Sequence, residues 1–293
     1  MAVSMSYKSP FIIPPETMRR EADSLRVAIS DGSESDKVTV LKLLAKRDIC
    51  HDHGAHDIFR SYCRKNYVNH NTLEMIAEMR GIIARELTSI GFPDPNLGNS
   101  WQNRNSTDSS LAFLQATIAA GLYPNIASRK RGDTAFRTMT SNQQSKIHLS
   151  SINAMKGQPL NSKSKVGEQD LEFLVYGELM RGAKTFTMDQ TSYIGSPLPF
   201  LLFCGDFRIR PLHGKGGRNS NMAVMLVDNL VKFSCDQQDA SALTLLRSRL
   251  NVIFQKIVAN PSKGLDALNE PERFTLDVLQ DVIQSSFNSS ARR

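Results

Sequence analysis

The spacing of apolar residues changes partway along this chain of 293 residues, and that change limits the folds it can adopt. Up to residue 92, apolar residues recur every three or four positions, which is the period of an amphipathic helix. We expect helices over residues 16–29 and 71–91, and a third with Ser35 or Asp36 as its N-cap. From Leu122 onwards, short apolar runs alternate with turn-forming residues, which is typical of strands. The sequence therefore predicts an α+β fold.

Residues 93–109 are rich in Pro, Gly, Asn and Ser, and we place a linker there. Before it lies a helical segment over residues 1–92, in which residues 48–57 form a polar connector. After it, residues 110–260 form a domain of short strands with flanking helices, and residues 261–293 form a C-terminal helical tail. Short strands separated by turns predict a small barrel or sandwich rather than a parallel sheet.

The four cysteines and the apolar runs bear on where the protein resides. Cysteines at wide, irregular spacing do not make a disulfide framework, which favours a reducing, intracellular compartment. No segment approaches the roughly 20 apolar residues that a membrane span needs. Prolines interrupt the apolar run at the N-terminus, which is not the pattern of a secretory signal. We therefore expect a protein of the nucleus or cytoplasm without a membrane partner.

Basic residues are in excess only in the middle third of the chain. Residues 121–219 contain 14 Lys and Arg against 7 Asp and Glu, which accounts for the whole formal net charge of +7. Residues 1–120 hold 14 of each sign, and residues 220–293 hold 8 of each. A basic surplus confined to one region predicts a surface that binds a polyanion.

Several segments of the chain carry a resemblance to one family. In the strand-rich half they are GLYPNIA (121–127), KIHLSSIN (146–153), FLVYGELMR (173–181), SPLPFLLFCGD (196–206) and VMLVDNLVKF (224–233). In the helical half they are SESDKVTVLKLL (33–44) and CRKNYVNHNTLEMIAEMRGII (63–83). Together these resemble the C-terminal region of DExH-type (DEAH-type) ATP-dependent RNA helicases, most closely the RNA helicase A and maleless branch.

This resemblance implies both a fold and a function. The helical segment corresponds to the helicase-associated, ratchet-like region, and the strands correspond to a five-stranded oligonucleotide-binding (OB) barrel. The implied function is RNA binding as the C-terminal portion of an ATP-dependent RNA helicase. The implied partners are single-stranded RNA and the RecA-like motor domains of the parent enzyme.

The motifs of a helicase motor do not occur in the sequence. There is no G-x-x-x-x-G-K-[ST] loop to bind phosphates, no Asp-Glu-x-His tetrad to hold Mg²⁺ and no Gln-Arg-x-Gly-Arg run. We therefore expect no catalytic residue, no cofactor and no ATPase activity in this chain, with ATP and Mg²⁺ bound by the motor domains of a parent. The alternative is a stand-alone, truncated adaptor that binds RNA or docks on a protein without enzymatic activity.

The resemblance also implies RNA-binding residues. His148, Ser150 and Ser151 match the family's His-x-Ser/Thr-Ser loop, whose ring, backbone and hydroxyls contact single-stranded RNA. The simpler interpretation is a turn with a solvated histidine. Leu149 and Leu179 stand where the family usually has other residues, often basic ones, which implies modest affinity.

The charge surplus adds further candidates around that loop. Single-stranded RNA is bound by basic grooves that follow its backbone. A run of three charges is also typical of a solvated loop. The basic candidates are Arg129, Lys130, Arg131, Arg137, Lys146 and Arg181.

Histidines and cysteines gather between residues 50 and 70. Zinc prefers tetrahedral sites with sulfur and nitrogen ligands, which Cys50, His53, His56 and Cys63 could supply. Their spacing matches no established zinc finger, so we expect no metal. Cys63 is better interpreted as a small buried apolar residue.

Overall fold

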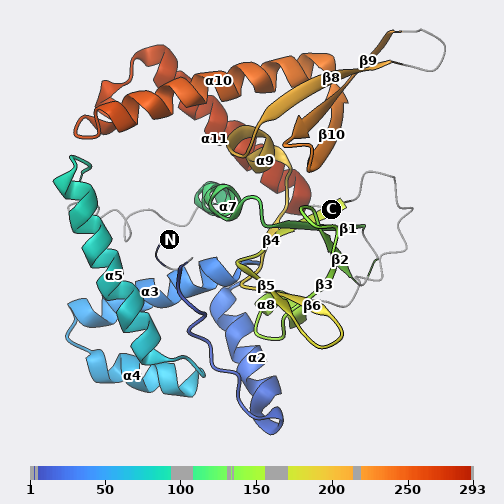
Figure 1. Ribbon diagram of the computed structural model, residues 1–293. Helices are drawn as coiled ribbons and strands as arrows, with labels where there is room; N and C mark the ends of the chain where they lie inside the picture. Colours follow the sequence, from blue (N-terminus) through green and yellow to red (C-terminus); the bar gives the residue numbers. More distant parts are fainter. Residues whose placement is uncertain are drawn as a thin grey trace. The chain divides into compact units, whose positions relative to one another are not determined.

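The computed structural model describes residues 3, 6–93, 108–130, 133, 135–155, 171–213 and 219–291 (Figure 1). The helices are α2 (Glu16–Ser30), α3 (Asp36–Asp52), α4 (His56–Lys65), α5 (His70–Ser89), α7 (Asp108–Leu122), α8 (Ile152–Met155), α9 (Leu198–Phe203), α10 (Gln237–Ala259), η1 (Gly264–Ala267) and α11 (Glu270–Ala291). The strands are β1 (Ile126–Lys130), β2 (Phe136–Thr138), β3 (Gln144–Ile147), β4 (Leu171–Val175), β5 (Glu178–Arg181), β6 (Phe186–Asp189), β7 (Ser192–Ile194), β8 (Phe207–His213), β9 (Asn219–Val227) and β10 (Val231–Asp236).

The chain divides into two compact units, and each is built from two separate stretches. Unit 1 comprises residues 1–82 and 125–193, and unit 2 comprises residues 83–124 and 194–293. The N-terminal helices and the first group of strands therefore fold together in unit 1. Of the predicted linker, residues 94–107 lie outside the described residues, so the predicted domain boundaries stay a prediction.

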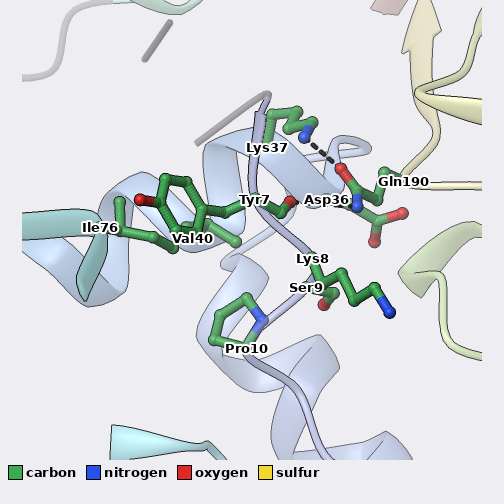
Figure 2. Close-up of a pocket in the computed structure, with 9 residues that line it drawn as sticks. All are labelled: Tyr7, Lys8, Ser9, Pro10, Asp36, Lys37, Val40, Ile76 and Gln190. Atoms are coloured by element: carbon green, nitrogen blue, oxygen red, sulfur yellow. Dashed lines mark hydrogen bonds between the residues drawn. The ribbon is translucent and has the colours of Figure 1, made fainter. Parts of the chain in front are cut away.

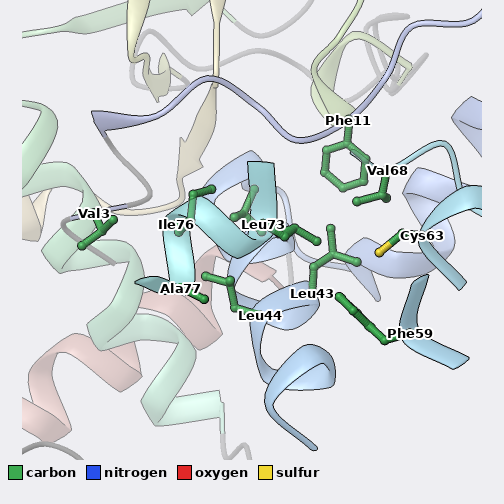
Figure 3. Packing of buried hydrophobic residues seen from close by; sticks show 11 residues of the cluster. Val3, Phe11, Leu43, Leu44, Phe59, Cys63, Val68, Leu73, Ile76 and Ala77 are labelled. Atoms are coloured by element: carbon green, nitrogen blue, oxygen red, sulfur yellow. The ribbon is translucent and has the colours of Figure 1, made fainter. Parts of the chain in front are cut away.

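The helices of unit 1 bury one apolar cluster. Its members come from α3, α4 and α5, from residues that precede α2 and from Val68 between α4 and α5, and Figure 3 shows how they pack. The largest are Phe11, Leu43, Phe59, Leu73 and Ile76. As predicted, Ser35 caps α3: its hydroxyl accepts a hydrogen bond from the Val38 amide at 3.3 Å.

The predicted polar connector over residues 48–57 is wrong, because most of it is helical. Helix α3 continues to Asp52 and α4 begins at His56. Helix α4 buries Phe59 and Cys63, which are 0% and 1% exposed. Two buried residues one turn apart, surrounded by charged ones, give too short a pattern to reveal a helix from sequence.

The strands confirm the α+β fold, but they are arranged differently from the predicted five-stranded barrel. Seven strands form one sheet in the order β5-β6-β3-β2-β1-β4-β7, and β8, β9 and β10 form a separate sheet. The pair β3–β6 is parallel, whereas β1–β2, β1–β4, β2–β3 and β5–β6 are antiparallel.

One reason why the strand arrangement differs from the prediction is that a single predicted strand is interrupted. The run LEFLVYGELM divides into β4 and β5 at Gly177, whose amide donates to the Asp189 carbonyl at 3.0 Å. A Cβ atom on Gly177 would lie 3.2 Å from the Cβ of Gln190. The backbone approaches Gln190 closely there, and glycine permits that approach.

Unit 2 surrounds its own apolar cluster with helices. Residues of α7, α9, α10 and α11 form it, among them Ala116, Leu202, Leu250 and Ile283. The three-stranded sheet of this unit is antiparallel in the order β10-β9-β8. No helix among the described residues is long and apolar enough to span a membrane.

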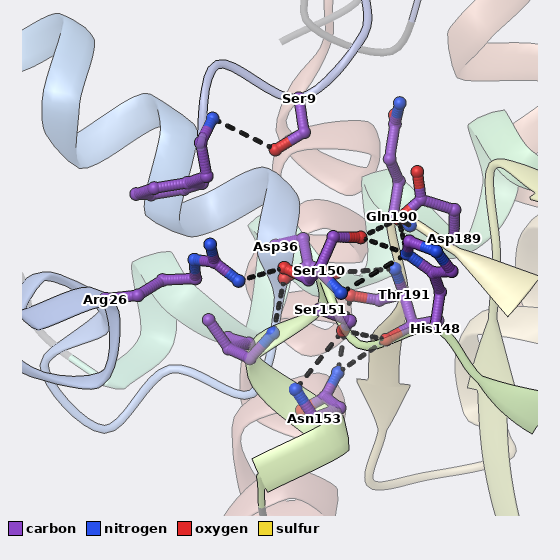
Figure 4. A network of polar contacts seen from close by, with 12 residues as sticks. Ser9, Arg26, Asp36, His148, Ser150, Ser151, Asn153, Asp189, Gln190 and Thr191 are labelled. Carbon is purple, nitrogen blue, oxygen red and sulfur yellow. Dashed lines mark hydrogen bonds and ion pairs between the residues drawn. The ribbon is translucent and has the colours of Figure 1, made fainter. Parts of the chain in front are cut away.

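A buried carboxylate joins the helices of unit 1 to its sheet. Asp36, the first residue of α3, accepts hydrogen bonds from the amides of Ile152 at 2.9 Å and Thr191 at 2.8 Å (Figure 4). The Asp36 amide donates back to the Thr191 carbonyl at 3.0 Å. The hydroxyls of Ser35 and Ser192 share a hydrogen bond of 2.6 Å beside it. Burial raises the pKa of Asp36 to about 6.

Two cations are buried near this carboxylate. Arg26 and Lys37 are each 2% exposed. Lys37 donates to the side-chain oxygen of Gln190 at the wall of a small pocket (Figure 2). Burial lowers the pKa of Lys37 to about 8, with Asp36 and Asp189 opposing that change. Because the pocket has room for about one water molecule, it cannot hold a nucleotide.

We predict that Asp36→Asn changes how stability depends on pH. Burial raises the pKa of Asp36 from 3.8 to about 6, so the folded state keeps this proton to a higher pH than the unfolded state. Ionisation of Asp36 therefore lowers the free energy of unfolding as the pH rises from about 4 to about 6, by about 3 kcal/mol. Asn does not ionise, so urea unfolding should show the variant gaining stability relative to the wild type across this range. A constant difference between the two proteins would contradict the raised pKa.

Candidate nucleic-acid interface

Three predicted basic residues lie on one face of the seven-stranded sheet. Arg137 of β2 pairs with Ser128 of β1 and with Gln144 of β3. Side chains two residues apart on a strand point to the same side. Lys130 and Lys146, two residues beyond Ser128 and Gln144, therefore share the face of Arg137, and all three are exposed. We call Lys130, Arg137 and Lys146 the basic face.

Arg129 points to the opposite side of the sheet and is held there. Its Nε donates to the Glu172 carboxylate at 2.6 Å, and its Nη2 donates to the Tyr193 hydroxyl at 3.0 Å. Its guanidinium carbon lies 4.5 Å from the centre of the Phe136 ring. The side chain is only 9% exposed. Arg129 thus occupies a position in the sheet's packed side, away from the basic face.

The remaining basic candidates are Arg181 and Arg131. Arg181, at the end of β5, pairs with Phe186, which in turn pairs with Ser145, so it lies on the side opposite Lys146. Its guanidinium lies 5.9 Å from the centre of the Phe186 ring, and the residue is exposed. Arg131 lies outside the described residues.

The predicted RNA-contacting loop follows β3 directly and is anchored from beneath. The His148 amide donates to the Met188 carbonyl at 2.8 Å, which extends the pairing of β3 with β6. The Ser150 hydroxyl donates to the Asp189 carboxylate at 2.6 Å and lies 2.6 Å from the His148 Nδ1 atom. The Ser150 amide also donates to that Nδ1 at 3.2 Å. The His148 side chain is nevertheless 31% exposed.

The second serine of the loop is fully buried. The hydroxyls of Ser151 and Thr191 lie 2.7 Å apart, and the Asn153 amide donates to the Ser151 hydroxyl at 3.2 Å (Figure 4). Both predicted serine hydroxyls therefore form hydrogen bonds inside the protein. The exposed side chains of this loop are those of His148, which is partly exposed, and Leu149, which is 62% exposed.

Sequence reasoning missed two residues that hold this loop. Arg26 donates to the Ser150 carbonyl, and Asp189 accepts from the Ser150 hydroxyl. A signal for Arg26 existed: it lies four residues from both Ala22 and Ser30 on the buried side of α2. Asp189 ends a strand and had no such signal.

Serine, histidine and aspartate meet here without the geometry of a nucleophile. In a catalytic triad the carboxylate orients the imidazole, and the imidazole accepts the serine proton. Here the Ser150 hydroxyl donates to Asp189 itself, and the His148 Nδ1 lies 3.8 Å from that carboxylate. The arrangement fixes the loop and activates no hydroxyl.

The histidine-rich stretch surrounds a carboxylate. The Nε2 atoms of His51 and His70 lie 3.4 and 3.3 Å from Glu74, which also accepts a hydrogen bond of 3.0 Å from Arg47. Burial opposes ionisation of Glu74, but the hydrogen bonds and charge of Arg47 lower its pKa. Among the described residues, no group of three or more His, Cys, Asp or Glu side chains is placed to hold a metal ion.

We predict that Arg129→Gln and Lys130→Gln differ sharply in stability. The first removes a nearly buried cation from Glu172, which should cost about 2–4 kcal/mol in the free energy of unfolding. The second removes an exposed charge and should change it by less than about 0.5 kcal/mol. Urea unfolding of both variants measures the difference, and equal values would contradict the placement of Arg129.

Comparison with known proteins identifies the sheet of unit 1. Residues 114–207 match a family described as an oligonucleotide/oligosaccharide-binding (OB) fold. This stretch contains β1 to β7, including the basic face and the loop after β3.

Known helicases match a larger part of the chain. The DExH-box ATP-dependent RNA helicase DExH1 of Arabidopsis thaliana is 28% identical, over 89% of this chain and 24% of its own length. The ATP-dependent DNA/RNA helicase DHX36 of Bos taurus is 26% identical, over 89% of this chain and 24% of its own. The ATP-dependent RNA helicase DHX29 of Homo sapiens is 23% identical, over 91% of this chain and 18% of its own.

The chain thus spans about a quarter or less of the length of these relatives. The matches confirm the resemblance to DExH-type RNA helicases and are consistent with a C-terminal helicase segment. Over most of its length this chain is similar to DExH-box RNA helicases, and it carries an OB-fold domain.

Proposed function

We propose that this chain binds single-stranded RNA as the C-terminal portion of a DExH-box ATP-dependent RNA helicase. The observation that carries the proposal is the basic face. Lys130, Arg137 and Lys146 come from three neighbouring strands within the matched OB-fold stretch, and all three are exposed. Within the described part of the chain, none of their side chains forms an ion pair. Cations free in this way can contact phosphates without breaking internal contacts.

The loop after β3 supplies a second kind of contact beside these cations. Lys146 and His148 are two residues apart on β3 and its extension, so they lie on the same side of the sheet. The His148 ring is partly exposed and braced by Ser150. A histidine ring held in place beside exposed cations can form hydrogen bonds with unpaired bases, because the edges of the bases are accessible in single strands. Phosphates would contact the basic face while His148 contacts a base or phosphate at its margin.

The names of the relatives favour RNA as the nucleic acid. DExH1 and DHX29 are named as RNA helicases, and DHX36 as a DNA/RNA helicase. In the proposed parent enzyme, RecA-like motor domains would supply ATP binding and hydrolysis, and this segment would hold the RNA strand. Matched RNA and DNA oligonucleotides of one sequence distinguish the two ligands.

We predict that replacing the three cations of the basic face by Gln weakens binding. Three phosphate contacts on a single strand contribute about 2 to the slope of log K against log salt, so affinity in about 0.1 M salt should fall roughly a hundredfold. Fluorescence anisotropy of a labelled single-stranded RNA, measured over a range of salt concentrations with the full chain, gives both quantities.

The control for this triple variant carries the same loss of charge elsewhere in unit 1. Arg20→Gln/Arg60→Gln/Lys65→Gln changes three exposed cations on helices α2 and α4. It should keep nearly all the affinity and slope of the wild type. Equal effects of the two triple variants would show that net charge, rather than the basic face, governs binding.

We predict that the purified chain does not hydrolyse ATP, with or without RNA, because its sequence lacks the phosphate-binding and Mg²⁺-binding motifs. A phosphate-release assay checks this, and RNA-stimulated hydrolysis would overturn it.

The reading frame upstream of Met1 distinguishes the helicase hypothesis from the adaptor hypothesis. An in-frame P-loop and Asp-Glu-x-His motif would support the helicase, and a stop codon would favour the adaptor.

A further inference from the structure

The three-stranded sheet of unit 2 has two chemically different faces. On β9, alternate residues Ala223, Met225 and Val227 are fully buried, whereas on the other side Met222 and Val224 are half-buried and only Leu226 is buried. Strand β10 alternates in the same way, from buried or half-buried to exposed residues. The sheet therefore packs with one face and leaves the other, at least partly, open to solvent.

The open face carries cations on both of its outer strands. Leu226 of β9 pairs with Arg208 of β8 on one side and with Lys232 of β10 on the other. The next pair along on this face joins Arg210 to Val224. Arg208, Arg210 and Lys232 are all exposed. We call these three residues the second basic face.

Three carboxylates lie on the same side of the sheet as these cations: Asp206, Asp228 and Asp236. The Asp206 carboxylate lies 3.9 Å from the Arg208 guanidinium, and both side chains are mostly exposed, so their attraction is screened by water. Asp228 accepts hydrogen bonds from the Tyr123 hydroxyl and the Asp206 amide, and these bonds, together with the charges of Arg247 and Arg208, lower its pKa. Asp236 lies at the far end of β10, opposite Met222.

We propose that the second basic face binds the phosphate backbone of a single-stranded nucleic acid. Arg208 and Arg210 stand about 7 Å apart along β8, and β10 runs about 10 Å from β8. The three cations are therefore spaced to contact different phosphates of one strand. The inference rests on the proposed function and adds a contact surface outside residues 114–207, the stretch that matches the OB fold.

The composition of this face determines what it recognises. Its central residues Met222, Val224 and Leu226 are apolar but not aromatic. Bases therefore have no ring to stack on, and binding depends on phosphates. Such contacts carry no direct sequence information and are strongly dependent on salt. The second basic face holds any single strand, while His148 in unit 1 is the group placed to contact a base.

The test compares two double variants of the full chain. Arg208→Gln/Lys232→Gln removes the two cations that flank Leu226, and Arg249→Gln/Lys263→Gln removes two exposed cations elsewhere in unit 2. The probe is a labelled oligouridine, measured by anisotropy over a range of salt concentrations. Two lost contacts should reduce the salt slope by about 1.4 and the affinity in about 0.1 M salt by about 25-fold. The second variant should match the wild type, and both should keep the wild-type circular dichroism and melting temperature.

The outcomes separate this inference from the proposed function. If Arg208→Gln/Lys232→Gln binds oligouridine like its control while the basic-face variant of unit 1 does not, this inference is wrong and the proposed function stands. If the wild type binds no oligonucleotide, both are wrong. If the variant keeps oligouridine binding but loses binding to polyglutamate, the second basic face serves an acidic protein segment and the inference is overturned.

Discussion

The carboxylate of Asp36 is the constraint on which unit 1 depends. It accepts hydrogen bonds from amides 116 and 155 residues further along the chain, while the residue itself begins helix α3. A buried carboxylate is costly unless hydrogen bonds satisfy it, and both amides would be unpaired without it. The helical and strand-rich stretches therefore fold as one unit because each satisfies the buried polar groups of the other. An isolated strand segment would leave the amides of Ile152 and Thr191 without this partner.

The same contacts decide what the loop after β3 can offer a ligand. Arg26 donates a hydrogen bond to the Ser150 carbonyl, and Asp189 accepts one from the Ser150 hydroxyl. The hydroxyls of Thr191 and Ser151 share a third hydrogen bond. The two serines that resemble RNA contacts therefore brace the loop, and His148 and Leu149 form its exposed part. A leucine contributes no charge there. The exposed cations come from neighbouring strands, and the proposed RNA binding therefore rests on the face of the sheet more than on the loop.

The sequence allowed most of the helices and strands to be predicted, but not their assembly. Long amphipathic helices such as α2, α3 and α5 have enough apolar positions to reveal their period, whereas α4 buries only Phe59 and Cys63. The period of two along β1 already implied that Arg129 and Lys130 point to opposite sides. In contrast, the burial of Lys37 depends on Gln190, which lies 153 residues away. No local pattern reports such a partner, and the division of the strands into two sheets is set by equally distant contacts.

The interleaving of the two units has a consequence for synthesis on the ribosome. Unit 1 needs residues 125–193 to complete its sheet, and unit 2 needs residues 194–293 to cover its first stretch. When Tyr193 emerges, helix α7 has already left the ribosome without the helices α10 and α11 against which its apolar side chains pack. The apolar side of the alanine-rich helix α7 therefore stays partly exposed until the last hundred residues have been synthesised. Exposed apolar surface of this kind is a target for chaperones and for aggregation during translation.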